Sequence, residues 1–304
     1  MSLLTYVQNG LTAVSKEIAE TKYPEIVFPQ FVYVDQQTAV GITEKLHYGA
    51  DEHGSLDDGL ITTGTSTLDQ VEVGFTPKRS YIVPWAKSVT WTKPELEQGK
   101  LLGLNLDTAK IMALNKNAQQ TLQKVAFLGH AKDGRLTGLL NSKDVSVHTL
   151  KGAAAGAKVQ AMDFDKAVAF FKEMFLAGLE KTKRIEAPNT FAIDAIDLAH
   201  LALTQRANTD TTALEFLTKS LSAAAGREVA IKALPSNFGS RVTDGKTRAI
   251  VYVNSKEHVI FDVPMTPTVL EAKEKGLLAY ESGLRMAFGG VTFIEPESAL
   301  YVDY

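Results

Sequence analysis

The longest stretch of helical hydrophobic spacing runs from Asn105 to about Leu128. Its apolar side chains recur at intervals of three, four and seven residues, which places them on one face of an α-helix. Lysine and amide side chains lie off that face, and Gly129 stands where a left-handed C-cap is expected. At ~1.5 Å per residue the helix is roughly 35 Å long, enough to form the backbone of a subunit. The predicted apolar face contains Leu104, Ile111, Leu114, Ala118, Leu122 and Val125.

Two further stretches show the same spacing. Residues 3–20 predict a short amphipathic helix that ends before Tyr23-Pro24, because the residue preceding a proline avoids the helical region. Residues 163–183 predict a second long helix, with Asp163 as its N-cap. The apolar face of this second helix is expected to contain Phe164, Val168, Phe171, Phe175 and Leu179.

Strand-like patterns fill much of the first ninety residues. Residues 23–35 (YPEIVFPQFVYVD) predict an extended arm lying across another surface, such as that of a neighbouring subunit. Pro29 removes a backbone donor and so excludes a central strand. Residues 68–76 alternate, and residues 80–91 are rich in β-branched and aromatic side chains. With Pro77-Lys78-Arg79 between them, they predict two antiparallel strands with a tight connection.

Both tryptophans, Trp85 and Trp91, fall in the second of these strands. One interpretation is that they pack in a hairpin or core. The other is that they form an aromatic anchor at a subunit interface, where such side chains are enriched.

The pattern changes after Pro188. NTFAIDAIDLAHLALT predicts a short strand and then a helix, and TTALEFLTKSLSAA predicts another helix that ends at Gly226. REVAIKALP, TRAIVYV and HVIFDV predict strands, so residues 189–264 form a compact α/β unit. Residues 276–304 are β-rich, with a bend at Gly289-Gly290.

The loops carry no recognisable binding motif. Residues 36–66 are loop-like, and the acidic stretch 51–59 (DEHGSLDDG) lacks the spacing and the closing glutamate of a calcium-binding EF-hand. GAAAGAK (152–158) has a misplaced lysine and no following serine or threonine, so it is not a phosphate loop. The glycine-rich stretch 127–141 predicts a compact turn.

Composition narrows the class of protein. The chain has 304 residues, 45% of them hydrophobic, which is enough for one large domain or two. The net charge of -3 excludes the basic field of a sequence-reading DNA-binding domain. Cysteine is absent, which excludes disulfides and thiolate chemistry. No apolar run approaches a membrane span, and residues 1–20 do not have the pattern of a signal peptide.

A search for catalytic or metal-binding residues finds none. No H-E-x-x-H, G-x-S-x-G or G-x-G-x-x-G motif occurs. Asp194 and Asp197 lie one helical turn apart, but we expect one to be a cap and the other to be solvated. The sequence therefore predicts no catalytic, cofactor-binding or metal-binding residue, no cofactor, and no enzyme activity. The histidines, none of them paired at helical metal spacing, are His47, His53, His130, His148, His200 and His258.

The order of elements along the whole chain resembles the Hong Kong 97 (HK97-like) capsid fold of tailed-bacteriophage major capsid proteins, an α+β fold. Four stretches carry the resemblance: the arm YPEIVFPQF (23–31), the strand SYIVPWAKSVTW, the turn FLG…GLLN (127–141), and the closing GGVTFIEPESALYVDY (289–304). Between the strand and the turn lies a long helix rich in small and amide residues.

The resemblance implies four parts. Residues 1–35 would form an N-terminal arm, and residues 36–92 an extended β-hairpin loop. Residues 93–185 with 285–304 would form a peripheral domain around the long spine helix. Residues 186–284 would form an axial α/β domain near the capsomer centres.

The resemblance also implies the function and the partners. The protein would be a virion structural protein that self-assembles through hexamers and pentamers into an icosahedral capsid around double-stranded phage DNA, bound without sequence specificity. Scaffolding, portal and decoration proteins would be its other partners, and assembly would take place in the cytoplasm of the host bacterium. No membrane is expected. The mild negative charge is compatible with this role, because a shell contains DNA without reading its bases.

Three alternatives stay open at this point. An encapsulin-like nanocompartment shell shares the fold but encloses a cargo enzyme. An enzyme with an unrecognised site is possible because triads are assembled by folding and not by adjacency. Another virion structural protein, such as a tail component, would form rings or tubes.

Overall fold

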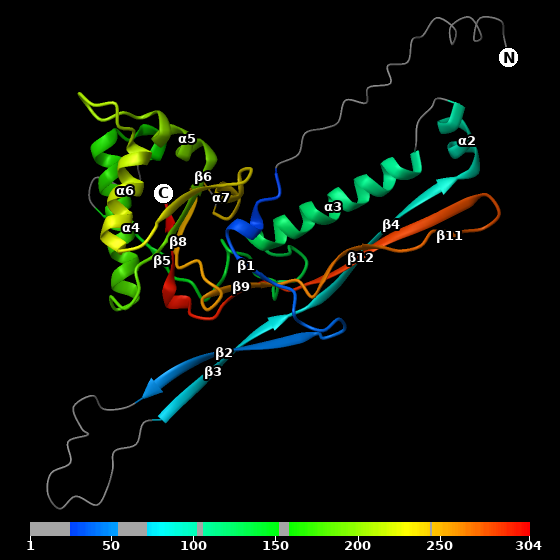
Figure 1. Cartoon of the computed structure of the whole chain (residues 1–304), viewed down its shortest axis with the longest axis horizontal. Helices are drawn as coiled ribbons and strands as arrows, with labels where there is room; N and C mark the ends of the chain where they lie inside the picture. The colour runs from blue at the N-terminus through cyan, green and yellow to red at the C-terminus, as the bar shows by residue number, and fades with distance from the viewer. Residues whose placement is uncertain (1–24, 54–71, 102–105, 152–157, 244) are drawn as a thin grey trace, which may run out of the picture.

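The computed structural model describes residues 25–53, 72–101, 106–151, 158–243 and 245–304 (Figure 1). The predicted helix over residues 3–20 and nearly all of the GAAAGAK segment lie outside these residues. The described helices are η1 (Phe28–Gln30), α2 (Lys93–Leu101), α3 (Leu106–Leu128), η3 (Val159–Ala161), α4 (Phe164–Lys181), α5 (Ala195–Leu203), α6 (Ala213–Ala225), α7 (Phe238–Arg241) and η4 (Pro296–Ser298).

The described strands form four sheets. Strands β2 and β3 pair only with each other, and β1-β9-β13 form a small sheet. Strand β12 pairs with β4, β10 and β11, and the largest sheet has the order β5-β14-β8-β6-β7. The strands are β1 (Tyr33–Asp35), β2 (Glu44–His53), β3 (Glu72–Tyr81), β4 (Val83–Thr92), β5 (Val147–His148), β6 (Thr190–Asp194), β7 (Ala230–Leu234), β8 (Arg248–Tyr252), β9 (Val259–Asp262), β10 (Met265–Val269), β11 (Lys273–Glu274), β12 (Ala279–Phe288), β13 (Val291–Phe293) and β14 (Ala299–Asp303).

Helix α3 is the predicted spine. It lies along the ribbon formed by β4 and β12 and packs on β4, β10 and β12 (Figure 1). Leu114, Ala118, Leu122 and Val125 are buried, which confirms the predicted apolar face over this part of the helix. Gly129 follows the last helical residue with φ +68°, the left-handed conformation expected of a C-cap.

The predicted hairpin between residues 68–76 and 80–91 is wrong. Strands β3 and β4 follow each other but do not pair: β3 pairs with β2, and β4 pairs with β12 in a register that sets Trp85 opposite Met286. Local alternation identifies a strand but not its partner. Pro77 lies inside β3. It is tolerated there because β3 pairs with β2 on one side only, so backbone positions on its other edge need no N–H donor. Both tryptophans pack in the core, Trp91 fully and Trp85 partly, against β12.

The α/β unit follows its prediction more closely. Strands β6, β7, β8 and β9 and helices α5 and α6 occur where the pattern placed them, and Gly226 ends α6 in the left-handed conformation. Asp163 caps α4 by accepting a hydrogen bond from the Lys166 backbone N–H at 3.0 Å. The buried face of α4 is rotated from the predicted one, because the helix packs on α6 as well as on β8 and β14. Its buried residues are Ala167, Phe170, Phe171, Met174, Phe175 and Gly178.

Three local predictions need correction. Residues 44–53, predicted to be loop-like, form strand β2, because they pair with β3 along their whole length. Asp194 caps α5 as expected, but Asp197 is buried and not solvated, because its carboxylate accepts a hydrogen bond from the Tyr304 hydroxyl at 2.5 Å. Residues 28–30 form a 3-10 turn instead of continuing an extended arm. Phe31 is buried in this chain's own core, with its ring 5.1 Å from that of Phe127. Strand β1 is an edge strand, as the proline predicted.

Two hydrophobic clusters hold the described residues together. One joins η1, α3 and the strands that surround them, including Leu284, Met286 and Phe288 of β12. The other joins α4, α5 and α6 to the five-stranded sheet and includes Val302 of β14. Helix α4 therefore packs with the α/β unit, and β12 packs with the spine.

A charge on the buried face of the spine tests this packing. Leu122→Asp should abolish soluble folding, because an unpaired buried charge costs several kcal/mol against a net stability of about 5–15 kcal/mol. Gln119→Asp, on the exposed side of the same helix, is the matched control and should change stability by less than ~0.5 kcal/mol. Comparing the soluble yield and the circular dichroism spectra of the two variants shows which face of the helix is buried. Equal behaviour would mean that the buried face is misplaced.

Candidate assembly surfaces

The β2–β3 hairpin projects from the body of the molecule (Figure 1). Its root lies against β13, and Figure 1 shows the other end pointing away from every other described element. Ten paired residues in each strand give it a length of about 33 Å. A two-stranded ribbon of this kind is marginally stable on its own, so its length suits contact with another surface.

One face of the hairpin is apolar and exposed. Leu46 and Tyr48 of β2 lie on the same face as Val73 and Phe75 of β3, because cross-strand partners point to the same side. Their exposed fractions are 42%, 59%, 49% and 65%. Contiguous exposed apolar side chains on a protein surface mark a site of association.

The opposite face is polar and turns toward the molecule at its root. It carries Lys45, His47 and Ser80, of which His47 and Ser80 are buried. The hairpin thus presents its polar side to its own subunit and its apolar side to solvent. This is the reverse of what an isolated subunit needs, so we take the apolar face as a candidate assembly surface.

A buried charge cluster fixes the root of the hairpin. The Asp262 carboxylate on β9 is fully buried and lies 3.0 Å from Lys45 Nζ and 2.9 Å from His47 Nε2. Lys45 also bonds to Asp35 at the end of β1, and Asp35 accepts a second hydrogen bond from the Gln37 backbone N–H at 2.8 Å. The cluster therefore joins β1, β2 and β9.

The environment shifts the pKa values of this cluster in one consistent sense. Burial alone would raise the pKa of Asp35 and of Asp262. Hydrogen bonds from Lys45 and the Gln37 backbone lower the pKa of Asp35 below the ordinary value of 3.8, and hydrogen bonds from His47 and Lys45 lower that of Asp262. Burial alone would lower the pKa of Lys45, but its bonds to the two carboxylates raise it. The ionised forms are thus the ones that the folded protein stabilises.

These shifts predict a loss of stability in acid. A carboxyl whose pKa is lowered on folding contributes stability above its ordinary value, and that contribution disappears as the pH falls through the lowered value. The melting temperature should therefore fall as the pH drops from about 5 to 3. Asp262→Asn should cost about 3 kcal/mol at neutral pH, because it removes the buried carboxylate that pairs with His47 and one of the two that pair with Lys45. The same substitution should flatten the acid limb.

Thermal unfolding followed by circular dichroism between pH 3 and 7 measures both effects. Asp210→Asn, which removes an exposed carboxylate, is the control and should leave the curve unchanged. An acid limb of equal depth in the Asp262→Asn variant would contradict the assignment.

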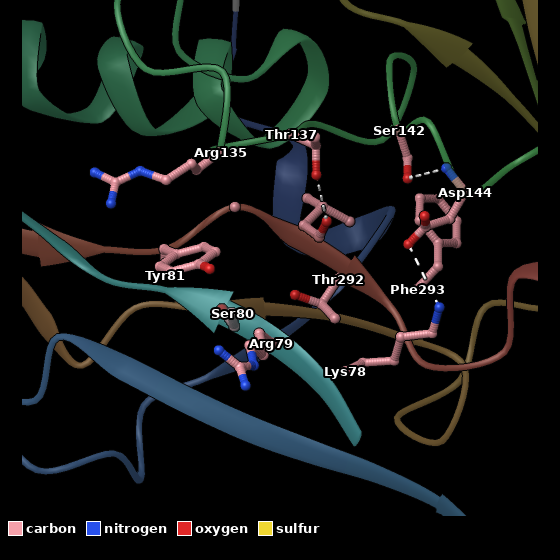
Figure 2. A pocket seen from close by; sticks show the side chains of 12 residues that line it. Lys78, Arg79, Ser80, Tyr81, Arg135, Thr137, Ser142, Asp144, Thr292 and Phe293 are labelled. Carbon is pink, nitrogen blue, oxygen red and sulfur yellow. Dashed lines mark hydrogen bonds and ion pairs between the residues drawn. The ribbon is translucent and has the colours of Figure 1, made fainter. Parts of the chain in front are cut away.

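A second candidate surface is a small polar pocket beside the hairpin root, with a volume of about 90 Å³ (Figure 2). The end of β3, the turn after α3, and β13 with the preceding glycine form its walls. The turn is compact, as predicted: a Cβ on Gly138 would lie 2.5 Å from the Gly129 backbone nitrogen. Thr137 ties the turn to β13 by donating to the Val291 carbonyl at 3.1 Å.

Basic side chains surround this pocket, each with an acidic partner. Lys78 lies 3.6 Å from Asp144, as the dashed line in Figure 2 shows, and Arg79 lies 3.3 Å from Glu44. Arg135 makes a two-point contact with Asp133, which lowers the pKa of Asp133 to about 2, and its guanidinium lies 5.1 Å from the centre of the Tyr81 ring. The side chains of Arg79 and Arg135 stay mostly exposed, so these ion pairs contribute little to stability.

Three histidines acquire carboxylate partners that the sequence did not reveal, and one of them is His148, whose Nε2 lies 3.4 Å from Glu173. His47 pairs with Asp262, 215 positions away in the chain. His258 Nε2 lies 2.9 Å from Glu186 and 3.2 Å from Glu295, and its Nδ1 lies 2.6 Å from Ser255 Oγ. Within the part of the chain that the structure describes, no group of three or more His, Cys, Asp or Glu side chains is arranged to hold a metal. No described helix is long and apolar enough to cross a membrane.

Comparison with solved structures identifies the fold. The capsid of Myoviridae phage XM1 superposes with a TM-score of 0.80 at 15% identity, over 97% of both chains. Mycobacterium phage Ogopogo gives 0.59 at 13% identity, over 100% of this chain and 99% of the other. The capsid of an empty GTA particle gives 0.59 at 12% identity, over 100% and 98%. The protein has the HK97-like capsid fold, an α+β fold, as the sequence predicted.

The family follows from the sequence itself. A family model of the major capsid protein matches residues 57–304, most of the chain, and the chain therefore belongs to the major capsid protein family. No curated protein matches the sequence. The predicted family and the predicted role as a phage shell protein are confirmed, and the encapsulin-like alternative is not favoured.

Proposed function

We propose that this chain self-assembles through hexamers and pentamers into an icosahedral shell that encloses double-stranded phage DNA. The observation that carries the proposal is the hairpin whose apolar face points away from its own subunit. The partner that covers this face is a second copy of the chain, because every subunit of a shell is surrounded by other copies. Contacts of this kind are heterologous, and repeated copies related by rotation close into rings.

We also propose a structural role for each part of the subunit. Residues 1–35 act as an arm, and residues 36–92 form the extended loop. Residues 93–185 with 285–304 form the peripheral domain, and residues 186–284 contain the axial domain. The core clusters support one refinement: the axial unit includes α4 and β14, and β12 belongs with the spine.

The remaining partners follow from the same role. Scaffolding, portal and decoration proteins act with the shell protein, and assembly takes place in the cytoplasm of the host bacterium. DNA is held without sequence specificity, which agrees with a net charge of -3 and no extended basic field. The protein acts as a structural component and not as an enzyme.

Self-association is the direct test. The protein expressed alone or with its neighbouring genes should form rings and closed shells under negative-stain electron microscopy. A protein that stays monomeric at high concentration with its assembly partners present would contradict the proposal. Open tubes would indicate a tail component instead.

A second test removes the apolar contact without touching the subunit core. Tyr48→Ser with Phe75→Ser should leave the melting temperature nearly unchanged, because both side chains are exposed in the free subunit. If each aromatic contributes about 1 kcal/mol to association, the protein concentration needed for assembly should rise roughly 30-fold. Light scattering against protein concentration measures this.

The matched control is Tyr48→Phe with Phe75→Leu, which keeps the face apolar and should assemble like the wild type. Normal assembly of the serine variant would show that the hairpin face is not an interface.

A further inference from the structure

Helix α3 presents a face without carboxylates. Residues 108–128 read TAKIMALNKNAQQTLQKVAFL and contain three lysines and five amide side chains but no aspartate or glutamate. The whole chain, in contrast, carries a net charge of -3. The lack of acidic side chains is therefore a local property of this helix. Within residues 108–128 the exposed side chains are Thr108, Ala109, Met112, Ala113, Asn115, Asn117, Gln119 and Lys124.

Lysine and amide side chains line up along this helix. Lys110, Asn117 and Lys124 recur every seven residues, close to two full turns, so they form one stripe that is about 21 Å long. Strand β4 lies beside the helix (Figure 1), and Lys87 on this strand donates from Nζ to Asn117 Oδ1 at 2.7 Å. Lys116 lies next to the stripe, toward the exposed side of the helix. We call the surface formed by Lys87, Lys110, Lys116, Asn117 and Lys124 the spine face.

Positive charge dominates the elements that carry the spine face. Strand β4, helix α2 and helix α3 together contain six lysines against three acidic residues, a surplus of three positive charges. Glu95 of α2 lies 2.5 Å from Lys110 Nζ, so this lysine is partly neutralised. The other two acidic residues, Glu97 and Asp107, precede the stripe in the chain. The other lysines of the spine face are Lys87, Lys116 and Lys124.

We propose that the spine face contacts the phosphate backbone of the double-stranded DNA inside the shell. This inference rests on the proposed function and identifies the surface of the subunit that lines the interior. Lysine ammonium groups and side-chain amides are common partners of phosphate oxygens, and such contacts carry no sequence information. The exposed residues of α3 include no aromatic ring on which an unpaired base could stack, which favours a duplex over a single strand.

The spine face fits a polyanion better than it fits another protein. Protein interfaces depend on large aromatic or apolar anchors near their centre. Among the residues of α3 whose exposure the structure describes, Met112 is the one fully exposed large apolar side chain. The other exposed side chains of the helix are small, amide or lysine. The apolar hairpin face has the composition of a protein interface, and the spine face does not.

The basic side chains beside the hairpin root are less suited to phosphate. Lys78, Arg79 and Arg135 each pair with a carboxylate there, and an incoming phosphate would be repelled by those same carboxylates. On the spine face, Lys87 donates to the neutral amide of Asn117 instead. A phosphate oxygen can take the place of that amide oxygen without meeting a like charge.

A few such contacts per subunit are sufficient. With a salt slope of about -0.9 per phosphate, each contact is worth roughly eightfold in affinity at about 0.1 M salt. Many copies in one shell face the same DNA molecule, so their weak contacts act together. The inference therefore agrees with a chain whose net charge is negative.

Duplex binding by the purified full-length protein tests the inference. The probe is a fluorescent DNA duplex of about 30 base pairs, titrated at several salt concentrations between about 0.05 and 0.2 M. The spine variant is Lys87→Gln, Lys116→Gln and Lys124→Gln. Its affinity should fall at least ~50-fold at about 0.1 M salt, and the slope of log K against log salt should become shallower by about 2.7, because three phosphate contacts are lost.

Two further variants serve as controls. Lys172→Gln, Lys219→Gln and Lys246→Gln remove the same charge from exposed lysines of the α/β unit and should bind within about threefold of the wild type. Lys78→Gln, Arg79→Gln and Arg135→Gln remove it from the basic side chains beside the hairpin root. A larger loss of affinity in this last variant than in the spine variant would move the DNA contact to the pocket and overturn the inference.

Negative-stain microscopy of the same proteins separates this inference from the proposed function. If the wild type forms no shells, the proposed function fails, and the titration still tests the spine face. If the wild type forms shells and the spine variant loses no more DNA affinity than the α/β control, the inference fails and the function stands. A spine variant that binds DNA normally but forms no shells would assign this face to contacts between copies and would also overturn the inference.

A milder variant covers the case in which the triple substitution does not fold, as circular dichroism would show. Lys87→Gln with Lys124→Gln changes two exposed side chains only. Its affinity should fall at least ~10-fold and its salt slope should become shallower by about 1.8. Wild-type affinity and slope in this variant would contradict the assignment of the spine face to DNA.

Discussion

A single buried carboxylate, Asp262, fixes how the subunit presents itself to its neighbours. A buried charge costs several kcal/mol unless it is paired and hydrogen-bonded, so it constrains everything packed around it. Lys45 and His47 of the hairpin supply the pairing. The Gly289 backbone N–H donates to the Asp262 carbonyl at 2.7 Å, and the Val263 N–H donates to the Asp35 carbonyl at 2.8 Å. Asp262 thus holds the hairpin through its carboxylate and the bend after β12 through its backbone carbonyl, and Lys45 joins β1 to the same point through Asp35.

Because side chains alternate along a β-strand, the pairing of Asp262 with Lys45 and His47 also fixes which side chains of the hairpin face solvent. Successive side chains point to opposite faces, so once Lys45 and His47 face Asp262, Leu46 and Tyr48 must face away from the subunit. Slipping the hairpin by one residue would bury its apolar side chains but would leave Asp262 without partners. The exposed apolar face is therefore a consequence of satisfying a charge, and the subunit reaches a fully satisfied surface only when another copy covers that face.

The sequence predicts those features whose physics is local. The spine helix, the left-handed Gly129 and the cap at Asp163 depend on side chains within a few positions of one another. The wrong predictions depend on distant partners. Strand β4 pairs with β12, which lies almost 200 positions later in the chain. Asp197 is buried because the hydroxyl of Tyr304, 107 positions away, donates a hydrogen bond to its carboxylate. The charge cluster that orients the hairpin escaped prediction for the same reason, since Lys45 and Asp262 are separated by 217 positions.

The association free energy of the apolar hairpin face is small, which suits assembly through many weak and reversible contacts. The four apolar side chains of the hairpin are each about half exposed, so covering them contributes about 1 kcal/mol apiece. A total near 4 kcal/mol corresponds to millimolar affinity for one contact, before the cost of losing rigid-body freedom. In a ring each copy both gives and receives a hairpin, and the contact that closes the ring forms at the high effective concentration set by the contacts already made. Misplaced copies therefore dissociate readily, whereas correctly closed rings persist because no single contact can release a subunit.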